Sequence, residues 1–281
     1  MAGPVGVIAG RGQLPVHLCR ALAAQGRAVL LAEMDGFPVE NPDGLPLIRF
    51  RVEKLGALFK ELRKSGVDEL VFAGAVARPR LDPTKFDLKT VTLAPKFVAA
   101  MKGGDDGTLR AVLNIFEGEG FIIRAAHDLA PELLPGAGIP TRVQPTERDR
   151  KDTARAARIV AALAAADVGQ GAVVAQGVAL AVEAAPGTDR MLAYVADSAG
   201  ACRPDPAGAG GVFFKGPKPG QDRRVDLPVI GPQTVDAAAR AGLAGLAIEA
   251  GGVMVLDLPE TLARADAAGL FLWVRPPEER P

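Results

Sequence analysis

Lysines, arginines and aspartates gather in one short segment, residues 215–226, which reads KGPKPGQDRRVD. The segment lies between two apolar runs, 211–214 and 244–248, that are typical of strands. Carboxylate oxygens suit Mg²⁺ or Mn²⁺ ions that bridge substrate phosphates, and cations offset the charge of a phosphate leaving group. The segment therefore predicts phosphoryl chemistry in a cleft, with a solvated loop tied by surface ion pairs as the alternative. The residues that could carry this chemistry are Lys215, Lys218, Asp222, Arg224 and Asp226.

The spacing of Asp222 and Asp226 decides whether they can share one ion. In a strand their Cα atoms would be about 13 Å apart, which is too far. In a helical turn the two residues would be about 5 to 6 Å apart. Pro228 favours an extended Leu227, so the end of the segment is not a regular helix. We therefore expect a turn at 221–224 that leads into a strand, with at least one aspartate as a metal ligand, Asp226 being the first choice and Asp222 the second.

A second polar group follows another apolar, strand-like run. Gly187, Thr188 and Asp189 come shortly after Glu183. Thr188 and the Asp189 backbone could hold a sugar phosphate at the start of a helix, and Glu183 could be a further metal ligand or a base. An ordinary helix N-cap explains Thr188 and Asp189 almost as well.

A glycine loop near the N-terminus could bind an anion. Gly10, Arg11 and Gly12 follow one predicted strand and precede a predicted helix, where backbone amides can hold a phosphate. The third glycine of the dinucleotide fingerprint is replaced by Pro15. Glu33, however, follows the loop at roughly the sequence spacing of the acidic residue that binds the ribose in such proteins. The alternative for the glycines is a tight turn. After a later strand, Arg78 and Arg80 are equally consistent with an anion clamp and with solvated side chains.

Composition excludes several classes of function. The 33 basic residues equal the 33 acidic ones, so no net field attracts nucleic acid or an anionic bilayer. The two histidines, His17 and His127, give poor support to a zinc site or a histidine triad. Only Cys19 and Cys202 occur, and no signal-like start or run of about 20 apolar residues is present. We expect a cytoplasmic protein with free thiols.

Apolar runs alternate with amphipathic stretches along the chain, which is typical of an α/β fold with a mostly parallel sheet. We expect a Rossmann-like N-terminal domain at residues 1–135, a second α/β domain at 136–281 that carries the acidic and basic motif, and an active-site cleft between them. The linker is expected within residues 126–146. The expected strands are 5–9, 28–33, 47–50, 70–75, 172–175, 178–183, 211–215, 246–249, 253–256 and 270–274, and the expected helices are 16–24, 55–64, 108–117, 151–165 and 234–241.

Four blocks of sequence closely resemble the LpxI family, the metal-dependent UDP-2,3-diacylglucosamine pyrophosphatases of lipid A assembly in Gram-negative bacteria. They are VGVIAGRGQLP at 5–15, GGDDGTLRAVLNIFEGEGF at 103–121, GQGAVVAQGVALAVEAAPGTD at 169–189 and KGPKPGQDRRVDLPVIGPQT at 215–234. The resemblance implies hydrolysis of the substrate by water to UMP and 2,3-diacylglucosamine 1-phosphate, or lipid X, with Mg²⁺ or Mn²⁺. It also implies that the glycine loop cradles the nucleotide, with Gly74 and Ala75 near the ligand.

Two other functions stay open at this stage. The hypothesis of an NAD(P)-dependent oxidoreductase depends on the first βαβ unit alone, and this unit lacks the third glycine of the fingerprint. A non-catalytic protein that binds a nucleotide or a lipid would keep its ligand when Asp226 is replaced. We further expect possible peripheral contact with the inner membrane and a possible homodimer.

Overall fold

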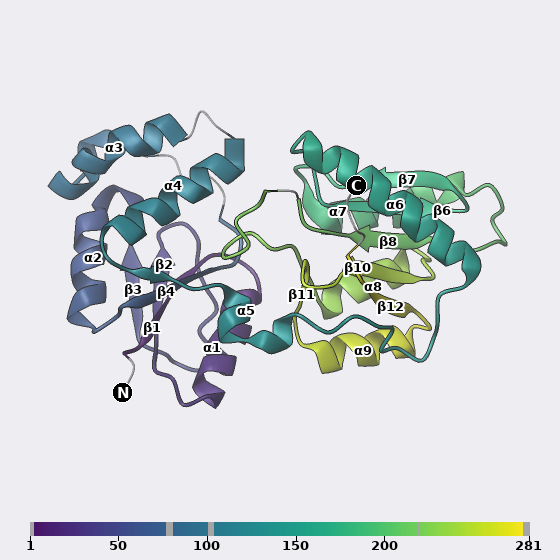
Figure 1. Ribbon diagram of the computed structural model, residues 1–281, viewed down its shortest axis with the longest axis horizontal. Helices are drawn as coiled ribbons and strands as arrows, with labels where there is room; N and C mark the ends of the chain where they lie inside the picture. Colours follow the sequence, from purple (N-terminus) through teal and green to yellow (C-terminus); the bar gives the residue numbers. More distant parts are fainter. Residues whose placement is uncertain (1–2, 77–80, 101–103, 219, 278–281) are drawn as a thin grey trace. The chain divides into compact units, whose positions relative to one another are not determined.

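The computed structural model describes residues 3–76, 81–100, 104–218 and 220–277 (Figure 1). The chain forms two compact units. The first comprises residues 1–131 together with 222–226, and the second comprises residues 132–221 and 227–281. The five residues 222–226, which we call the aspartate turn, therefore pack with the N-terminal part of the chain.

The first unit is built on a parallel sheet in the order β3-β2-β1-β4-β5. Every residue of the central strand β1 (Val5–Ala9) is buried, because strands lie on both sides of it. The chain leaves β1 towards β2 and later returns to β4 on the other side, and ligands bind at such switch points beyond the carboxyl ends of the strands. The other strands are β2 (Val29–Met34), β3 (Leu47–Phe50), β4 (Glu69–Ala73) and β5 (Ile122–Ile123).

Helices cover both faces of this sheet (Figure 1). On one face, α2 buries Leu58 and Phe59, and the Phe59 ring meets Phe116 of α4 edge to face at 5.1 Å between centroids. Phe116 makes a similar contact with Phe72 of β4 at 5.2 Å, and such pairs add about 1 kcal/mol each beyond area burial. The helices of the unit are α1 (Leu14–Ala24), α2 (Leu55–Lys64), α3 (Leu88–Ala100), α4 (Gly104–Gly118) and α5 (Ala126–Leu129), with short 3₁₀ turns at Val52–Lys54 and Pro83–Lys85.

The second unit contains a mixed sheet in the order β12-β10-β8-β6-β7. Strands β8, β10 and β12 are parallel, whereas β6 runs antiparallel to both β8 and β7. The strands are β6 (Gly171–Ala175), β7 (Val178–Val182), β8 (Val212–Lys215), β10 (Gly245–Glu249) and β12 (Phe271–Arg275), with a separate parallel pair β9 (Val229–Ile230) and β11 (Met254–Val255). The helices are α6 (Glu147–Ala165), α7 (Gly187–Asp197), α8 (Pro232–Arg240) and α9 (Leu258–Ala267), with 3₁₀ turns at Pro131–Leu133 and Ala199–Cys202.

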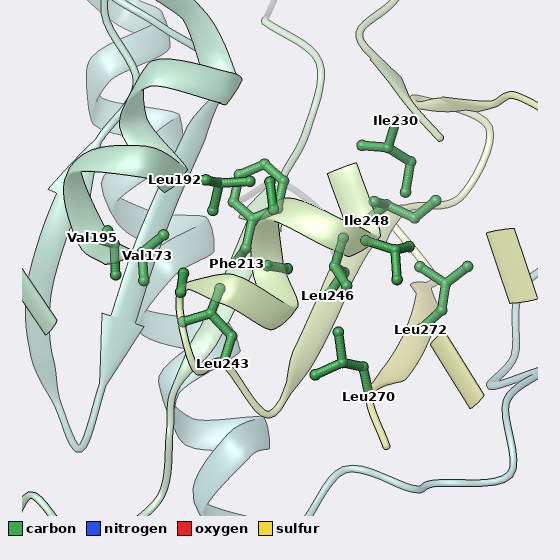
Figure 2. Close-up of a cluster of buried hydrophobic side chains, with 14 of the residues drawn as sticks. Val173, Leu192, Val195, Phe213, Ile230, Leu243, Leu246, Ile248, Leu270 and Leu272 are labelled. Atoms are coloured by element: carbon green, nitrogen blue, oxygen red, sulfur yellow. The ribbon is translucent and has the colours of Figure 1, made fainter. Parts of the chain in front are cut away.

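The inner strands β6, β8 and β10 are buried on both faces, which is why they are continuous apolar runs, whereas most of the edge strand β7 is exposed. Along β6, Val174 packs in the cluster beneath α6, and its neighbour Val173 packs in the cluster on the opposite face. Figure 2 shows that opposite cluster, where the fully buried Phe213, Leu246 and Leu272 converge from neighbouring strands. The α/β fold expected from the sequence is confirmed.

The predicted linker at 126–146 is only partly a linker. It begins with α5 in the first unit, and its later residues are bound to the second unit. Gly138 exchanges two backbone hydrogen bonds of 2.9 and 2.8 Å with Val274, and the Thr141 hydroxyl accepts one from the Leu272 amide at 2.9 Å. These contacts cover part of β12, the edge strand of the sheet, whose outer backbone groups need partners.

Helices α3 and α9 were not expected from the sequence. In α3, Pro95 lies inside the helix, a position that proline rarely occupies, so the sequence does not indicate a helix there. In α9 the start signals are present, because Pro259 stands in the first turn and the Asp257 side chain accepts a hydrogen bond from the Glu260 amide. The α9 helix was therefore predictable from its first turn, whereas α3 was not.

We expect Asp152→Ala to lower the free energy of unfolding by about 2 kcal/mol, because the hydrogen bonds that its charged side chain accepts from backbone amides are lost. Asp152 is 1 % exposed on α6, and its two carboxylate oxygens each accept a 2.7 Å hydrogen bond, from the Gln176 and Gly177 amides. Both residues have positive φ in the turn between β6 and β7. Urea unfolding measures the change. Arg155→Ala, on an exposed position of the same helix, is the control, and equal stability of the two variants would contradict the assignment.

Candidate functional site

The aspartate turn is one turn of helix rather than a strand. The amides of Val225 and Asp226 each donate a 3.1 Å hydrogen bond to the Asp222 carbonyl. The bond from Asp226 spans four residues, so the two aspartates have helical spacing, about 5 to 6 Å between β carbons. The sequence predicted a turn at 221–224 that leads into a strand; the turn is observed slightly later, at residues 223–225, and β9 follows after Pro228.

The guanidinium of Arg224 connects two carboxylates in the first unit. Its Nε donates to Asp222 Oδ1 at 2.9 Å, and one terminal nitrogen donates to Oδ2 at 2.7 Å. Its other terminal nitrogen donates to Glu117 Oε1 on α4 at 2.6 Å. These bonds from Arg224 hold the pKa of Asp222 below its usual value, with a smaller contribution from Arg110. Asp222 is therefore ionised at neutral pH.

A second cluster lies in the second unit, where β8 ends next to the start of α7. Lys215 Nζ donates to the Thr188 hydroxyl at 2.6 Å, and that hydroxyl donates to Glu183 Oε1 at 2.9 Å. Lys215 Nζ and Glu183 Oε1 are 3.8 Å apart. We call these three residues the lysine cluster. Lys215 is only 7 % exposed, and burial lowers its pKa, while the charges of Glu183 and Asp189 raise it.

Thr188 is not the N-cap of α7. The N-cap is Pro186, and Thr188 lies in the first turn of the helix, where its side chain faces the lysine cluster. The alternative of an ordinary cap is therefore wrong for Thr188, because its hydroxyl bonds to Lys215 and Glu183 instead of to a backbone amide.

The predicted metal ligands differ in their surroundings. In the described part of the chain, no group of three or more His, Cys, Asp or Glu side chains is arranged to hold a metal ion. A Mg²⁺ ion that also binds substrate phosphates needs only one or two carboxylates, so Asp222 and Asp226 on one turn fit that requirement. Glu183 fits differently: its Oε2 atom is buried without a hydrogen-bond partner among the described atoms.

Lys218 is held within the second unit by two contacts. Its Nζ donates to Asp167 Oδ1 at 2.6 Å, and its backbone amide donates to the buried Gln221 side chain at 2.9 Å. Only 14 % of the Lys218 side chain is exposed, against 49 % of Asp167. The charge of Lys218 is thus partly neutralised in this arrangement.

The glycine loop is joined to the end of β4 by its backbone. Arg11 and Ala75 exchange two hydrogen bonds of 2.9 Å, and the Gly10 amide donates to Ala73 at 2.7 Å. A β carbon on Gly10 would lie 2.7 Å from the Ala75 carbonyl oxygen, and one on Gly74 would lie 2.7 Å from that of Arg11. These two glycines are therefore required by the close approach of two backbone segments.

The rest of the loop is open to an anion. Gly12 has a φ of +101°, and a β carbon at this position would meet nothing within 4 Å. The N-cap of α1, Gln13, makes no side-chain cap hydrogen bond. The exposed Arg11 guanidinium donates to the Gly36 carbonyl at 3.2 Å and lies 5.2 Å from the centre of the Phe37 ring. Arg78 and Arg80 lie outside the described residues.

Glu33, the possible ribose ligand of an oxidoreductase, is already bound by protein groups. It accepts hydrogen bonds from the Val39 amide at 3.0 Å and from Arg49 at 2.9 Å. It lines a hollow of about 370 Å³ between α2 and the β2 and β3 strands. The hollow is lined by Glu33, Asp35, Ile48, Arg49, Phe50, Arg51, Lys54, Ala57, Leu58 and Glu61, a set that contains none of the predicted catalytic residues.

Sequence reasoning missed Glu117. Its partner Arg224 is 107 residues away, a distance that no local pattern bridges. A signal was nevertheless present, because an acidic side chain in the last turn of a helix opposes the helix dipole and needs a compensating cation.

The solved structures that the chain matches weakly include two nucleotide-sugar epimerases. UDP-glucose-4-epimerase from Stenotrophomonas maltophila, with bound NAD and formylated UDP-arabinopyranose, is 13 % identical over 99 % of this chain and 87 % of its own, with a TM-score of 0.33. The UDP-glucose 4-epimerase from Thermus thermophilus, in complex with NAD, is 15 % identical over 98 % and 86 %, with a TM-score of 0.30. Similarity this low supports no argument about fold or function.

The sequence comparisons are much stronger. Residues 4–133 match the LpxI N-terminal domain, and residues 136–273 match the LpxI C-terminal domain. The UDP-2,3-diacylglucosamine pyrophosphatase LpxI of Caulobacter vibrioides is 41 % identical over 277 residues, which cover 99 % of each chain. The chain therefore belongs to the LpxI family.

Proposed function

We propose that this protein hydrolyses the pyrophosphate bond of UDP-2,3-diacylglucosamine to UMP and 2,3-diacylglucosamine 1-phosphate in lipid A biosynthesis, with a divalent metal ion and water as the nucleophile. The observation that carries the proposal is the 41 % identity to the Caulobacter pyrophosphatase over 99 % of both chains. The aspartate turn and the lysine cluster supply residue types suited to this chemistry.

Asp226 and Asp222 are the proposed ligands of Mg²⁺ or Mn²⁺. Their helical spacing brings two carboxylates to one side of the turn, and Arg224 keeps Asp222 ionised. When bound, the ion would polarise the pyrophosphate and lower the pKa of the attacking water. Glu183 stays a proposed ligand through its buried Oε2 atom, which has no hydrogen-bond partner among the described atoms.

The lysine cluster is the proposed phosphate site of the second unit. The Lys215 ammonium has three donors and gives one to Thr188, so it can also donate to phosphate oxygens. Thr188 and Asp189 lie in the first turn of α7, where backbone amides and the helix dipole favour an anion. Lys218 and Arg224 are the other cations proposed to offset charge on the leaving group.

For the nucleotide, we propose binding at the glycine loop. Gly12, the start of α1 and the exposed Arg11 are the open parts of this loop, whereas Gly10 and Gly74 shape its backbone. Ala75 and Arg78 stay predicted contacts.

Location and assembly also stay proposals. Among the residues that the structure describes, no helix is long and apolar enough to cross a bilayer. A cytoplasmic location, peripheral contact with the inner membrane to reach the acylated substrate, and a homodimer remain as expected from the sequence.

Asp226→Ala should lower the rate of UMP and lipid X release by about 100-fold or more, because charge stabilisation at the reacting phosphate is lost. Mass spectrometry of the products, with Mg²⁺ and with EDTA, measures the effect. EDTA should abolish turnover by the parent protein as well. Asp197→Ala, an exposed aspartate at the end of α7, is the control. Failure of the parent to turn over with any divalent metal would refute the proposal and favour a binding protein.

As the pH is raised, the activity should begin to fall at a lower pH than it would if Lys215 had the pKa of an ordinary lysine. Burial lowers the pKa of Lys215 from its usual 10.5, so the ammonium loses its proton, and the phosphate its cation, as the pH rises through that lowered value. A profile of kcat/KM from about pH 7 to about pH 10.5 locates this limb. Lys215→Met should be slow throughout and lack the limb, while the exposed control Lys151→Met should keep it. An unchanged limb in Lys215→Met would assign it to another group.

A further inference from the structure

Internal hydrogen bonds shape the aspartate turn, and other contacts join it to the rest of the first unit. Its internal bonds join Val225 and Asp226 to the Asp222 carbonyl. The Val225 side chain packs against the apolar cluster that contains Phe116 of α4. A further contact is the ion pair between Arg224 and Glu117, which directly follows Phe116 on the same helix.

These contacts have different physical effects. The internal bonds set the shape of the turn, and Val225 provides non-directional apolar burial. A planar guanidinium that binds two carboxylates makes a directional contact, because its fixed arrangement of N–H groups sets the orientation of each carboxylate. Arg224 orients Asp222 by two bonds and is itself oriented by the bond to Glu117. Without Glu117, Arg224 would still bind Asp222, but the guanidinium of that pair would no longer be fixed to α4.

The position of Glu117 supports this role. An acidic side chain in the last turn of α4 is unfavourable for the helix, because the helix dipole is negative there. About a third of each partner is exposed, 38 % of Glu117 and 35 % of Arg224, so the pair is accessible and moderately screened.

We propose that Glu117 is a positioning residue for the pyrophosphatase reaction: through Arg224 it holds Asp222 and the aspartate turn in the orientation that the chemistry requires. This inference rests on the proposed function, because the turn carries the proposed metal ligands. Glu117 contacts neither substrate nor metal in this role. It affects the rate of the chemical step and leaves the binding of the substrate unchanged.

Glu117→Gln removes the charge and keeps the shape of the side chain. We expect the Val225 and Asp226 amides to exchange with deuterium about fivefold faster, and kcat to fall about fivefold with KM unchanged, as loss of a partly exposed ion pair allows. Glu117→Asp, which restores the charge, should recover part of both effects. Hydrogen exchange followed by mass spectrometry and steady-state kinetics measure them. The matched control is Glu260→Gln, which breaks a similar pair with Arg264 in the second unit.

Arg224→Lys provides a second test that retains a positive charge. A lysine lacks the planar fork that binds both carboxylates, so it should give the same faster exchange and lower kcat. Parent-like exchange and kcat in both variants would overturn the proposal, and so would faster exchange with an unchanged kcat. If the parent shows no turnover, the proposed function fails and the positioning role fails with it. The exchange measurement still decides separately whether Glu117 holds the turn.

Discussion

The ion pair of Arg224 with Asp222 is the interaction on which the proposed metal site depends. Two bonds of 2.9 and 2.7 Å keep the Asp222 carboxylate ionised and fix its orientation. The carbonyl of the same aspartate accepts the Asp226 amide, which gives two acids four residues apart the spacing of a helix. Pro228 then ends the turn, since it favours an extended residue before it, and the short strand β9 follows. Five residues thus give the two aspartates the backbone spacing of one helical turn.

Ion pairs also tie other charges of this segment, as the alternative of a solvated loop predicts. Lys218 binds Asp167, and Arg224 binds Glu117 as well as Asp222. Lys215 differs from these residues, because it is the last residue of β8 and is only 7 % exposed. Removing an ammonium from water is costly unless hydrogen bonds and an opposite charge compensate, and Thr188 and Glu183 supply one of each. The phosphate proposed to bind here would add a further opposite charge.

The sequence predicted correctly those helices and strands in which the pattern of apolar residues is uninterrupted. The strand at 5–9 and the helix at 55–64 have the predicted bounds, because a buried parallel strand is apolar throughout and an amphipathic helix repeats its apolar residues every three or four positions. Pro95 concealed α3 by breaking that repeat. The mixed pairing of β6 and the docking of residues 138–141 on β12 could not be predicted, because both depend on contacts between residues distant in the chain.

For the candidate site, the sequence indicated residue types and the turn, but not the partners that determine what each residue can do. The glycine loop illustrates the difference. Gly10 and Gly12 look equivalent in a phosphate-binding motif, yet a β carbon on Gly10 would meet the Ala75 carbonyl at 2.7 Å, whereas one on Gly12 would meet nothing within 4 Å. The first glycine is therefore needed for the approach of another backbone segment. Only the second leaves open space next to the start of α1, so the nucleotide binding proposed for this loop would depend on Gly12 and Arg11.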